Sequence, residues 1–361
     1  MVANLFYNTQ HYEAGNTRPT VLDICTGAGG EALGIENAGF SNVASVEIEP
    51  VACQTLRNNR PTWHVIESDI RAINGADFRG VDLLAGGVPC PPFTIAGKQL
   101  GANDERDLFP EALHLIEQVR PKAVMLENVP GFASTRFASY RNDLIGKLVR
   151  LRYDVQWRVL QASDYGVPQL RPRFVLVALR QPYAAAFCWP TPVKGCTTVS
   201  QAIGDLMAAD GWPGIVQWSY KANGIAPTLV GGSKKHGGPD LGPTRARKQW
   251  AMLGVDGLGI ANQAPGEDFP LDSLPRLTLR MAARIQAFPD TWTFAGGKTA
   301  AYRQIGNAFP PLVAQAVGEA IMAALLGNKR QYNRASIPFQ PTLFYGDGLL
   351  HTPIPQTQEV Y

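Results

Sequence analysis

A cysteine stands between two prolines at position 90, directly after the apolar run VDLLAGG. The prolines restrict the backbone on both sides, and a buried strand before them would display Cys90 rigidly at its end. The thiolate of cysteine is the strongest nucleophile among ordinary side chains. The pattern indicates a candidate nucleophile, with a buried structural cysteine as the alternative.

Three other residues suit such a nucleophile. Glu127 ends the apolar run AVMLE and lies near Cys90 if their two strands are neighbours, which suggests nucleophilic attack assisted by an acid. Arg171 and Arg173 are two residues apart, so on an extended backbone they point the same way and suit an anion or a carbonyl oxygen. A solvated strand end is the alternative for the arginines.

A glycine-rich turn follows the first apolar run, TVLDIC. Gly27 and Gly29 allow a tight turn and close approach to a ligand at a helix N-terminus. Residues 27–32 also fit the dinucleotide-binding fingerprint, with Glu47 at the position of a ribose-binding acid. A dehydrogenase, an S-adenosylmethionine site and a simple strand-to-helix turn therefore stay open here. Asp69 suits either an adenine amino group or a helix N-cap.

The elements that position these residues alternate along the chain. From residue 20 to about 180, short β-branched or apolar runs alternate with amphipathic stretches, which predicts an α/β fold with a doubly wound, mostly parallel sheet. Residues 181–275 are rich in glycine and proline and predict a separate, irregular insert. We expect a first catalytic part over 1–180, helices over 276–328 that return to it, and a tail over 329–361 without an assigned role.

Composition narrows the class of protein. The chain has 361 residues, 45% of them hydrophobic, and a net charge of +3, which is ordinary for a two-domain enzyme. Its five cysteines form no CxxC pair and its five histidines are scattered, so we expect neither a metal site nor a disulfide framework. The sequence shows no long apolar run and no signal pattern at the N-terminus, which predicts a cytoplasmic protein without a membrane span.

The segment PCPPF, the ENV that contains Glu127 and Asn128, the QLRPR of residues 169–173 and the QIGNA of residues 304–308 occur in this order. As a set they resemble the bacterial DNA (cytosine-5)-methyltransferase family of restriction-modification systems, and the resemblance runs from Val21 to about Ala324. Dehydrogenases have no reason to share this set. The resemblance implies a Rossmann-like methyltransferase domain and a target-recognition domain over 181–275.

The resemblance also implies roles for the catalytic residues. Cys90 would add to carbon 6 of a cytosine, which makes carbon 5 nucleophilic enough to accept a methyl group. Glu127 would hydrogen-bond ring nitrogen 3 and the exocyclic amine, and Arg173 would hold the carbonyl oxygen of the base. Arg171 would lie nearer the sugar-phosphate, and Asn128 would order the loop that carries Cys90.

By the same resemblance the cofactor is S-adenosyl-L-methionine. The residues implied to bind it are Asp23, Gly27, Gly29, Glu47, Ile48, Asp69, Ile70, Pro89, Leu108, Asn307 and Phe309. Cys25 and Ile48 replace aromatic residues that often flank the adenine in this family. Pro91 replaces the usual glutamine after the nucleophile, and Met281 stands where glutamate is common. None of these differences removes a reacting group, so we expect activity.

The implied substrate is double-stranded DNA, from which the target base must be flipped out. Residues 221–248 contain six basic residues and one acidic residue, as expected for phosphate contacts, although a flexible solvated loop is the alternative. The candidate DNA-binding residues are Lys234, Lys235, Arg245 and Arg247.

Two other functions stay open beside this one. They are an RNA methyltransferase, for which we find no CFT signature, and an inactive DNA-binding relative. We expect a monomer that acts beside a cognate restriction endonuclease.

Overall fold

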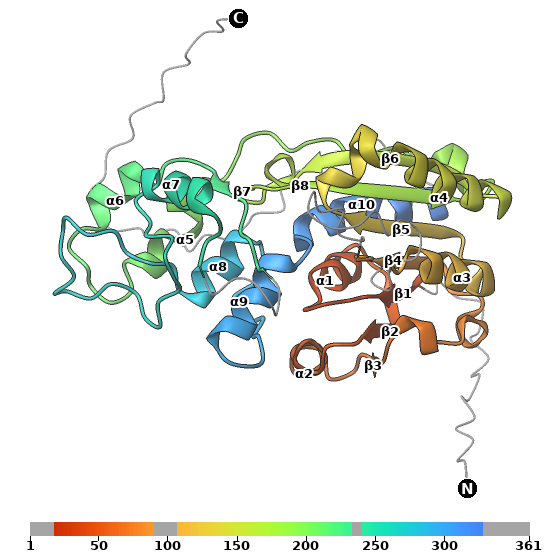
Figure 1. Ribbon diagram of the computed structural model, residues 1–361, viewed down its shortest axis with the longest axis horizontal. Helices are drawn as coiled ribbons and strands as arrows, with labels where there is room; N and C mark the ends of the chain where they lie inside the picture. Colours follow the sequence, from red (N-terminus) through yellow and green to blue (C-terminus); the bar gives the residue numbers. More distant parts are fainter. Residues whose placement is uncertain (1–17, 90–106, 233–239, 328–361) are drawn as a thin grey trace, which may run out of the picture.

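The computed structural model describes residues 18–89, 107–232 and 240–327 of the chain. Two lobes lie side by side in Figure 1. The sheet lobe contains a seven-stranded sheet in the order β3-β2-β1-β4-β5-β8-β6. Its strands are β1 (Thr20–Ile24), β2 (Ser41–Glu47), β3 (Val65–Glu67), β4 (Leu83–Gly86), β5 (Ala123–Asn128), β6 (Asp154–Gln161) and β8 (Pro172–Leu179).

The first five strands are parallel, and β8 runs antiparallel to both β5 and β6. This arrangement confirms the predicted doubly wound, mostly parallel sheet. The strands consist mainly of buried apolar residues because helices cover both faces of the sheet. These covering helices are α1 (Gly30–Asn37), α3 (Phe109–Val119), α4 (Ala138–Arg150) and α10 (Pro311–Leu325).

Alternation along β1 divides the core of the sheet lobe in two. Val21 belongs to the apolar cluster that contains α1 and α10, whereas Leu22 and Ile24 belong to the cluster under α3 and α4. Side chains of a strand alternate between faces, so Asp23 shares the face of Val21. A carboxyl group is thereby placed inside the layer that α1 covers.

The C-terminal helix α10 packs beside α1, as expected if Asn307 returns to the first strand. A Cβ on Gly30 would lie 2.2 Å from the Phe309 carbonyl oxygen, and one on Gly34 would lie 2.3 Å from that of Pro311. Glycine is therefore required where the two segments meet. Residues 298–325 are long and apolar enough to cross a membrane, but 61% of the most apolar window is buried in the protein, as in a core helix.

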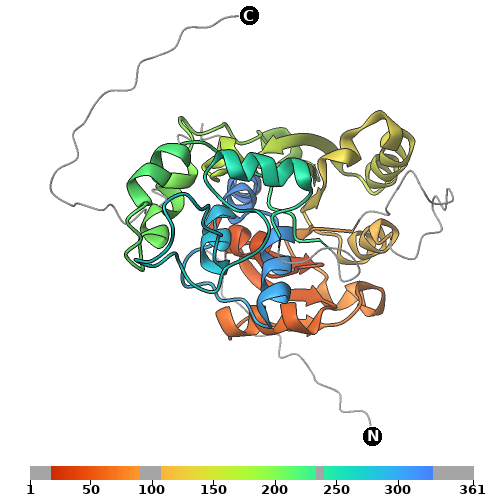
Figure 2. The ribbon, with the colours of Figure 1, turned by 60° about the vertical axis from the view of Figure 1, so that its left-hand side comes forward.

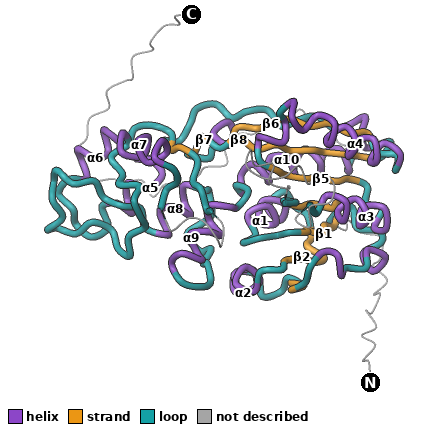
Figure 3. Tube along the Cα trace, viewed as in Figure 1, coloured by secondary structure: helices purple, strands orange, loops and turns teal. Residues whose placement is uncertain are grey.

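The second lobe, which we call the helical lobe, contains α5 to α9 and the long irregular segments between them (Figure 3). Trp212, Trp218 and Trp250 are buried in its core. A two-stranded parallel pair, β7 with β9, joins it to the sheet lobe. The elements are β7 (Gln169–Leu170), β9 (Ala226–Pro227), α5 (Val199–Met207), α6 (Ile215–Lys221), α7 (Thr244–Met252), α8 (Leu279–Ile285) and α9 (Lys298–Asn307).

The helices after residue 275 divide between the lobes. Met281 of α8 and Tyr302 of α9 belong to the same apolar cluster as Ile203 of α5, whereas α10 packs on the sheet lobe. Figure 2 shows the C-terminal helices, in blue, beside both the red part of the sheet lobe and the cyan part of the helical lobe. Two of the three helices over 276–328 thus pack with the insert, and the domain boundary at residue 275 remains a prediction.

Candidate functional site

The residues that could take part in a reaction lie where the parallel strands end. Glu127 is the next-to-last residue of β5, and β4 ends beside it, with Gly86 paired to Leu126. Pro89 follows β4 and is the last described residue before the segment that contains Cys90. Cys90 itself lies outside the described residues. The segment nevertheless starts at the same sheet edge as Glu127.

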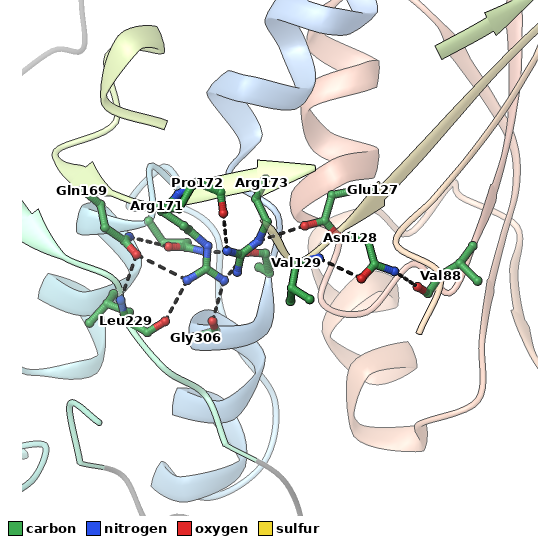
Figure 4. A network of polar contacts seen from close by, with 12 residues as sticks. Val88, Glu127, Asn128, Val129, Gln169, Arg171, Pro172, Arg173, Leu229 and Gly306 are labelled. Atoms are coloured by element: carbon green, nitrogen blue, oxygen red, sulfur yellow. Dashed lines mark hydrogen bonds and ion pairs between the residues drawn. The ribbon is translucent and has the colours of Figure 1, made fainter. Parts of the chain in front are cut away.

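Glu127 and Arg173 form a buried ion pair (Figure 4). The Arg173 Nε lies 2.9 Å from Glu127 Oε1, and both side chains are almost fully enclosed. Burial raises the pKa of Glu127 because the charged form loses water, while Arg173 and then Arg171 oppose this shift. A carboxyl group in this balance can accept or hold a proton when a neutral ring fills the remaining space.

Asn128 connects β5 to the segment that leads to Cys90. Its Nδ2 donates to the Val88 carbonyl at 2.8 Å, and its Oδ1 accepts from the Val129 amide at 2.8 Å (Figure 4). The amide therefore holds the backbone two residues before Cys90. This geometry supports the expected role in ordering the loop.

Arg171 is buried in the structure. The resemblance implies a position near a sugar-phosphate, and that role stays a prediction, while the residue is only 1% exposed among the described residues. Its guanidinium donates to the carbonyl oxygens of Leu229 at 2.7 Å, Gly306 at 2.7 Å and Ala308 at 3.0 Å. These oxygens replace water, which is why a charged side chain is accommodated in the interior. Arg171 ties the segment between β7 and β8 to the helical lobe and to the end of α9.

A cavity of about 420 Å³ opens beside Glu127 at the boundary of the two lobes. Its lining includes four of the predicted cofactor residues, Gly27, Glu47, Asn307 and Phe309, and also Cys25. The Glu47 carboxylate accepts hydrogen bonds from the Gly27 amide at 2.6 Å and the Glu49 amide at 2.8 Å. The turn thus presents a fixed carboxylate at the cavity wall.

Two of the predicted cofactor residues lie behind the cavity wall. Gly29 has a φ of 87°, and a Cβ there would meet Leu56 and Trp292 at under 3 Å, so close packing requires glycine at this position. Asp23 is completely buried, neither carboxylate oxygen has a hydrogen-bond partner among the described residues, and burial raises its pKa to about 7.

The remaining predicted cofactor residues are not among the residues that line this cavity. Asp69 caps a short helical turn by accepting from the Arg71 amide at 2.9 Å, which is the N-cap alternative. Ile70 is buried, and Ile48 is 58% exposed. Pro89 is exposed and Leu108 is half-buried. Pro89 precedes the segment 90–106, which lies outside the described residues, and Leu108 follows it.

Glu31 was not among the predicted residues, although it lines the cavity. It lies in the first turn of α1 and is buried, and neither carboxylate oxygen has a hydrogen-bond partner among the described residues. An acid in the first turn of a helix is ordinarily explained by the helix dipole, so its position gave no separate signal. The structure thus adds Glu31 to the enclosed carboxyl groups of Glu127, Glu47 and Asp23 at the site.

The candidate DNA-binding residues belong to the helical lobe. Lys234 and Lys235 lie outside the described residues. Arg245 is exposed on α7, and Arg247 is half-buried and donates to Thr244 Oγ1 at 3.2 Å. Trp250 is fully buried and fixes this helix to the lobe. The arrangement leaves Arg245 free to reach a polyanion.

Comparison with known proteins gives consistent results. A family model described as C-5 cytosine-specific DNA methylase matches residues 19–229 and 240–323. The Type II methyltransferase M.NaeI of Lentzea aerocolonigenes is 55% identical over 311 residues, or 84% of this chain and 75% of that protein. M.NgoMIV of Neisseria gonorrhoeae is 53% identical over 310 residues, or 85% of this chain and 98% of that protein.

Solved structures show the same fold. The structure of the Entamoeba histolytica methyltransferase EhMeth superposes with a TM-score of 0.62 at 16% identity. The superposition covers 86% of this chain and 99% of that one.

Proposed function

Because this chain belongs to the C-5 cytosine-specific DNA methylase family, we propose that it methylates carbon 5 of a flipped-out cytosine in a specific short duplex sequence. The observation that carries the proposal is the buried pair of Glu127 and Arg173 at the wall of the cavity that Gly27 and Glu47 also line. The same cavity thereby combines side chains that can bind a neutral base with side chains that can bind a nucleoside.

The chain's own residues account for activation of the base. The Cys90 thiolate forms a bond to carbon 6, and Glu127 shares its proton with ring nitrogen 3, so the negative charge that develops on the ring is neutralised. Arg173 donates to the carbonyl oxygen of the base and holds Glu127 in place. After carbon 5 has accepted the methyl group, loss of its proton to water re-forms the 5,6 double bond of the ring and expels the Cys90 thiolate.

The cavity fits S-adenosylmethionine in size and in donor set. Its volume of about 420 Å³ is in the usual range for small-molecule sites. Glu47 would accept hydrogen bonds from the ribose hydroxyl groups, the Gly27 turn would border the methionine part, and Asn307 with Phe309 would close the pocket. When bound, the cofactor supplies an electrophilic methyl group for the nucleophilic carbon 5.

The helical lobe would bind the DNA, with Arg245 and Arg247 of α7 and the segment around Lys234 and Lys235 on the phosphates. The two curated relatives are named as Type II methyltransferases, which supports a role as the modification enzyme of a Type II restriction-modification system beside a cognate endonuclease. Such a protein would act in the cytoplasm, as a monomer on its duplex.

The test is transfer of labelled methyl from S-adenosylmethionine to mixed genomic DNA and, separately, to transfer RNA, followed by bisulfite sequencing. We expect methylcytosine in DNA at one repeated short sequence. Label confined to transfer RNA would assign the activity to RNA instead, and no label in either substrate would contradict the proposed enzyme.

A further inference from the structure

Glu31 is a buried acid that lines the cavity. Only 4% of the residue is exposed, and both of its carboxylate oxygens lack a hydrogen-bond partner among the described residues. The nearby Gly86 amide lowers the pKa of Glu31, but burial outweighs it and the pKa is raised. Buried carboxyl groups in proteins are ordinarily paired, so a cation that reaches this one would be stabilised by it and would favour its charged form.

The surroundings of Glu31 are themselves acidic. A Cβ on Gly87 would lie 3.4 Å from Glu127 Oε2 and 3.9 Å from Glu31 Oε2, so both carboxyl groups face the same glycine. Asp23 is buried behind them and, like Glu127, raises the pKa of Glu31 further. Arg173 is engaged by Glu127 and leaves Glu31 without a counter-charge among the described residues.

We propose that Glu31 binds the cationic methionine end of S-adenosylmethionine. This inference rests on the proposed function and adds a binding residue to it. This end of the cofactor carries two positive charges, the sulfonium and the α-ammonium, against one α-carboxylate, so it is cationic overall, whereas the adenosine end is uncharged. A carboxylate between Glu127 and Asp23 balances that charge next to the base, where the methyl group must arrive. Gly87 leaves room there because it lacks a side chain.

Isothermal titration calorimetry of the full chain without DNA tests the proposal. Three probes separate the ends of the ligand: S-adenosylmethionine, S-adenosylhomocysteine, which keeps the ammonium, and methylthioadenosine, which lacks the amino-acid end. Glu31→Gln removes the charge with almost no change of shape. Glu111→Gln is the matched control, because Glu111 also lies in the first turn of a helix, α3, but away from the cavity.

We expect Glu31→Gln to weaken S-adenosylmethionine binding by about tenfold or more, the usual effect of losing a bond to a charged group, and to leave methylthioadenosine unchanged. Thermal melting without ligand checks the fold, and Glu111→Gln should match the unaltered protein throughout. Equal affinity of Glu31→Gln for S-adenosylmethionine would overturn this inference alone. Failure of the unaltered protein to bind S-adenosylmethionine would overturn the proposed cofactor, and the role of Glu31 with it.

Discussion

Arg173 at the start of β8 pairs with Glu127 at the end of β5, with 2.9 Å between Nε and Oε1. The pair exists because β8 runs antiparallel to β5, so the beginning of one strand lies beside the end of the other. A parallel β8 would carry Arg173 to the opposite edge of the sheet. The single reversed strand beside β5 therefore supplies a cation to the edge where the parallel strands end.

Glu127→Gln should lower the rate of methyl transfer by about 10²- to 10⁴-fold, the usual contribution of a general acid. Glutamine keeps the shape and can donate a hydrogen bond to ring nitrogen 3, but its amide cannot transfer a proton to it. Cofactor affinity should change by less than about twofold. Single-turnover rates on DNA, with calorimetry for the cofactor, measure both, and an unchanged rate would remove Glu127 from the mechanism.

Cys90→Ser should abolish methyl transfer and leave folding and DNA binding intact, because a serine hydroxyl is not ionised at neutral pH. Cys188→Ser is the control, since Cys188 is an exposed free cysteine. Labelled-methyl transfer and an electrophoretic shift with target DNA give the two measurements. Turnover by the Cys90 variant at the normal rate would disprove covalent catalysis by this residue.

Arg171→Met should lower the free energy of unfolding by about 3–5 kcal/mol, because it leaves buried carbonyl oxygens of three residues without a donor. Arg57→Met is the comparison, since Arg57 pairs with Glu67 at an exposed site where such a bond contributes about 1 kcal/mol or less. Urea unfolding measures both variants. Similar losses for the two would show that Arg171 does not tie the lobes together.

Asp23→Asn should change how stability depends on pH. The pKa of Asp23 is raised from 3.8 to about 7 in the fold, so the folded protein holds this proton more tightly than the unfolded chain. The ligand-free protein should lose stability, on the order of a few kcal/mol, as pH rises from about 4 to 7. The variant should lack this loss. Thermal melts of both proteins across this pH range test the prediction. The same dependence of stability on pH in the two proteins would contradict it.

Arg245→Ala should weaken DNA binding and reduce the slope of log K against log salt by about one, as expected for one lost phosphate contact. Arg150→Ala, at an exposed position on α4 of the sheet lobe, should leave the slope unchanged. Titrations of labelled duplex at several salt concentrations test this. An equal slope for Arg245→Ala and the unaltered protein would place α7 away from the phosphates.

The alternation of strands and helices along the chain was predictable because the strands are apolar runs separated by turn residues. On that basis Glu127 could be placed at the edge of the sheet. The direction of β8 was not predictable, since it depends on how the chain returns after β6 and not on any residue within β8. That direction decides which groups meet Arg173.

The two arginines show a second limit. Their spacing predicted side chains that face one group, but Arg171 precedes β8 and binds carbonyl oxygens of Leu229 and Gly306, which are far away in the sequence. Glu31 was missed for a related reason: only the fold shows that its carboxyl group is buried near Asp23 and Glu127, without a hydrogen-bond partner among the described residues.

The wall of the cavity is built from the two ends of the described chain, because Gly27 lies near its start and Asn307 near its finish. N-terminal segments leave the ribosome first and start to fold during synthesis. A nascent polypeptide that has reached α7 thus carries the glycine turn and Glu47 but lacks the residues that face them. The cavity can form only after the chain has been synthesised through Phe309, so a nascent chain that ends before α9 lacks one wall of the site.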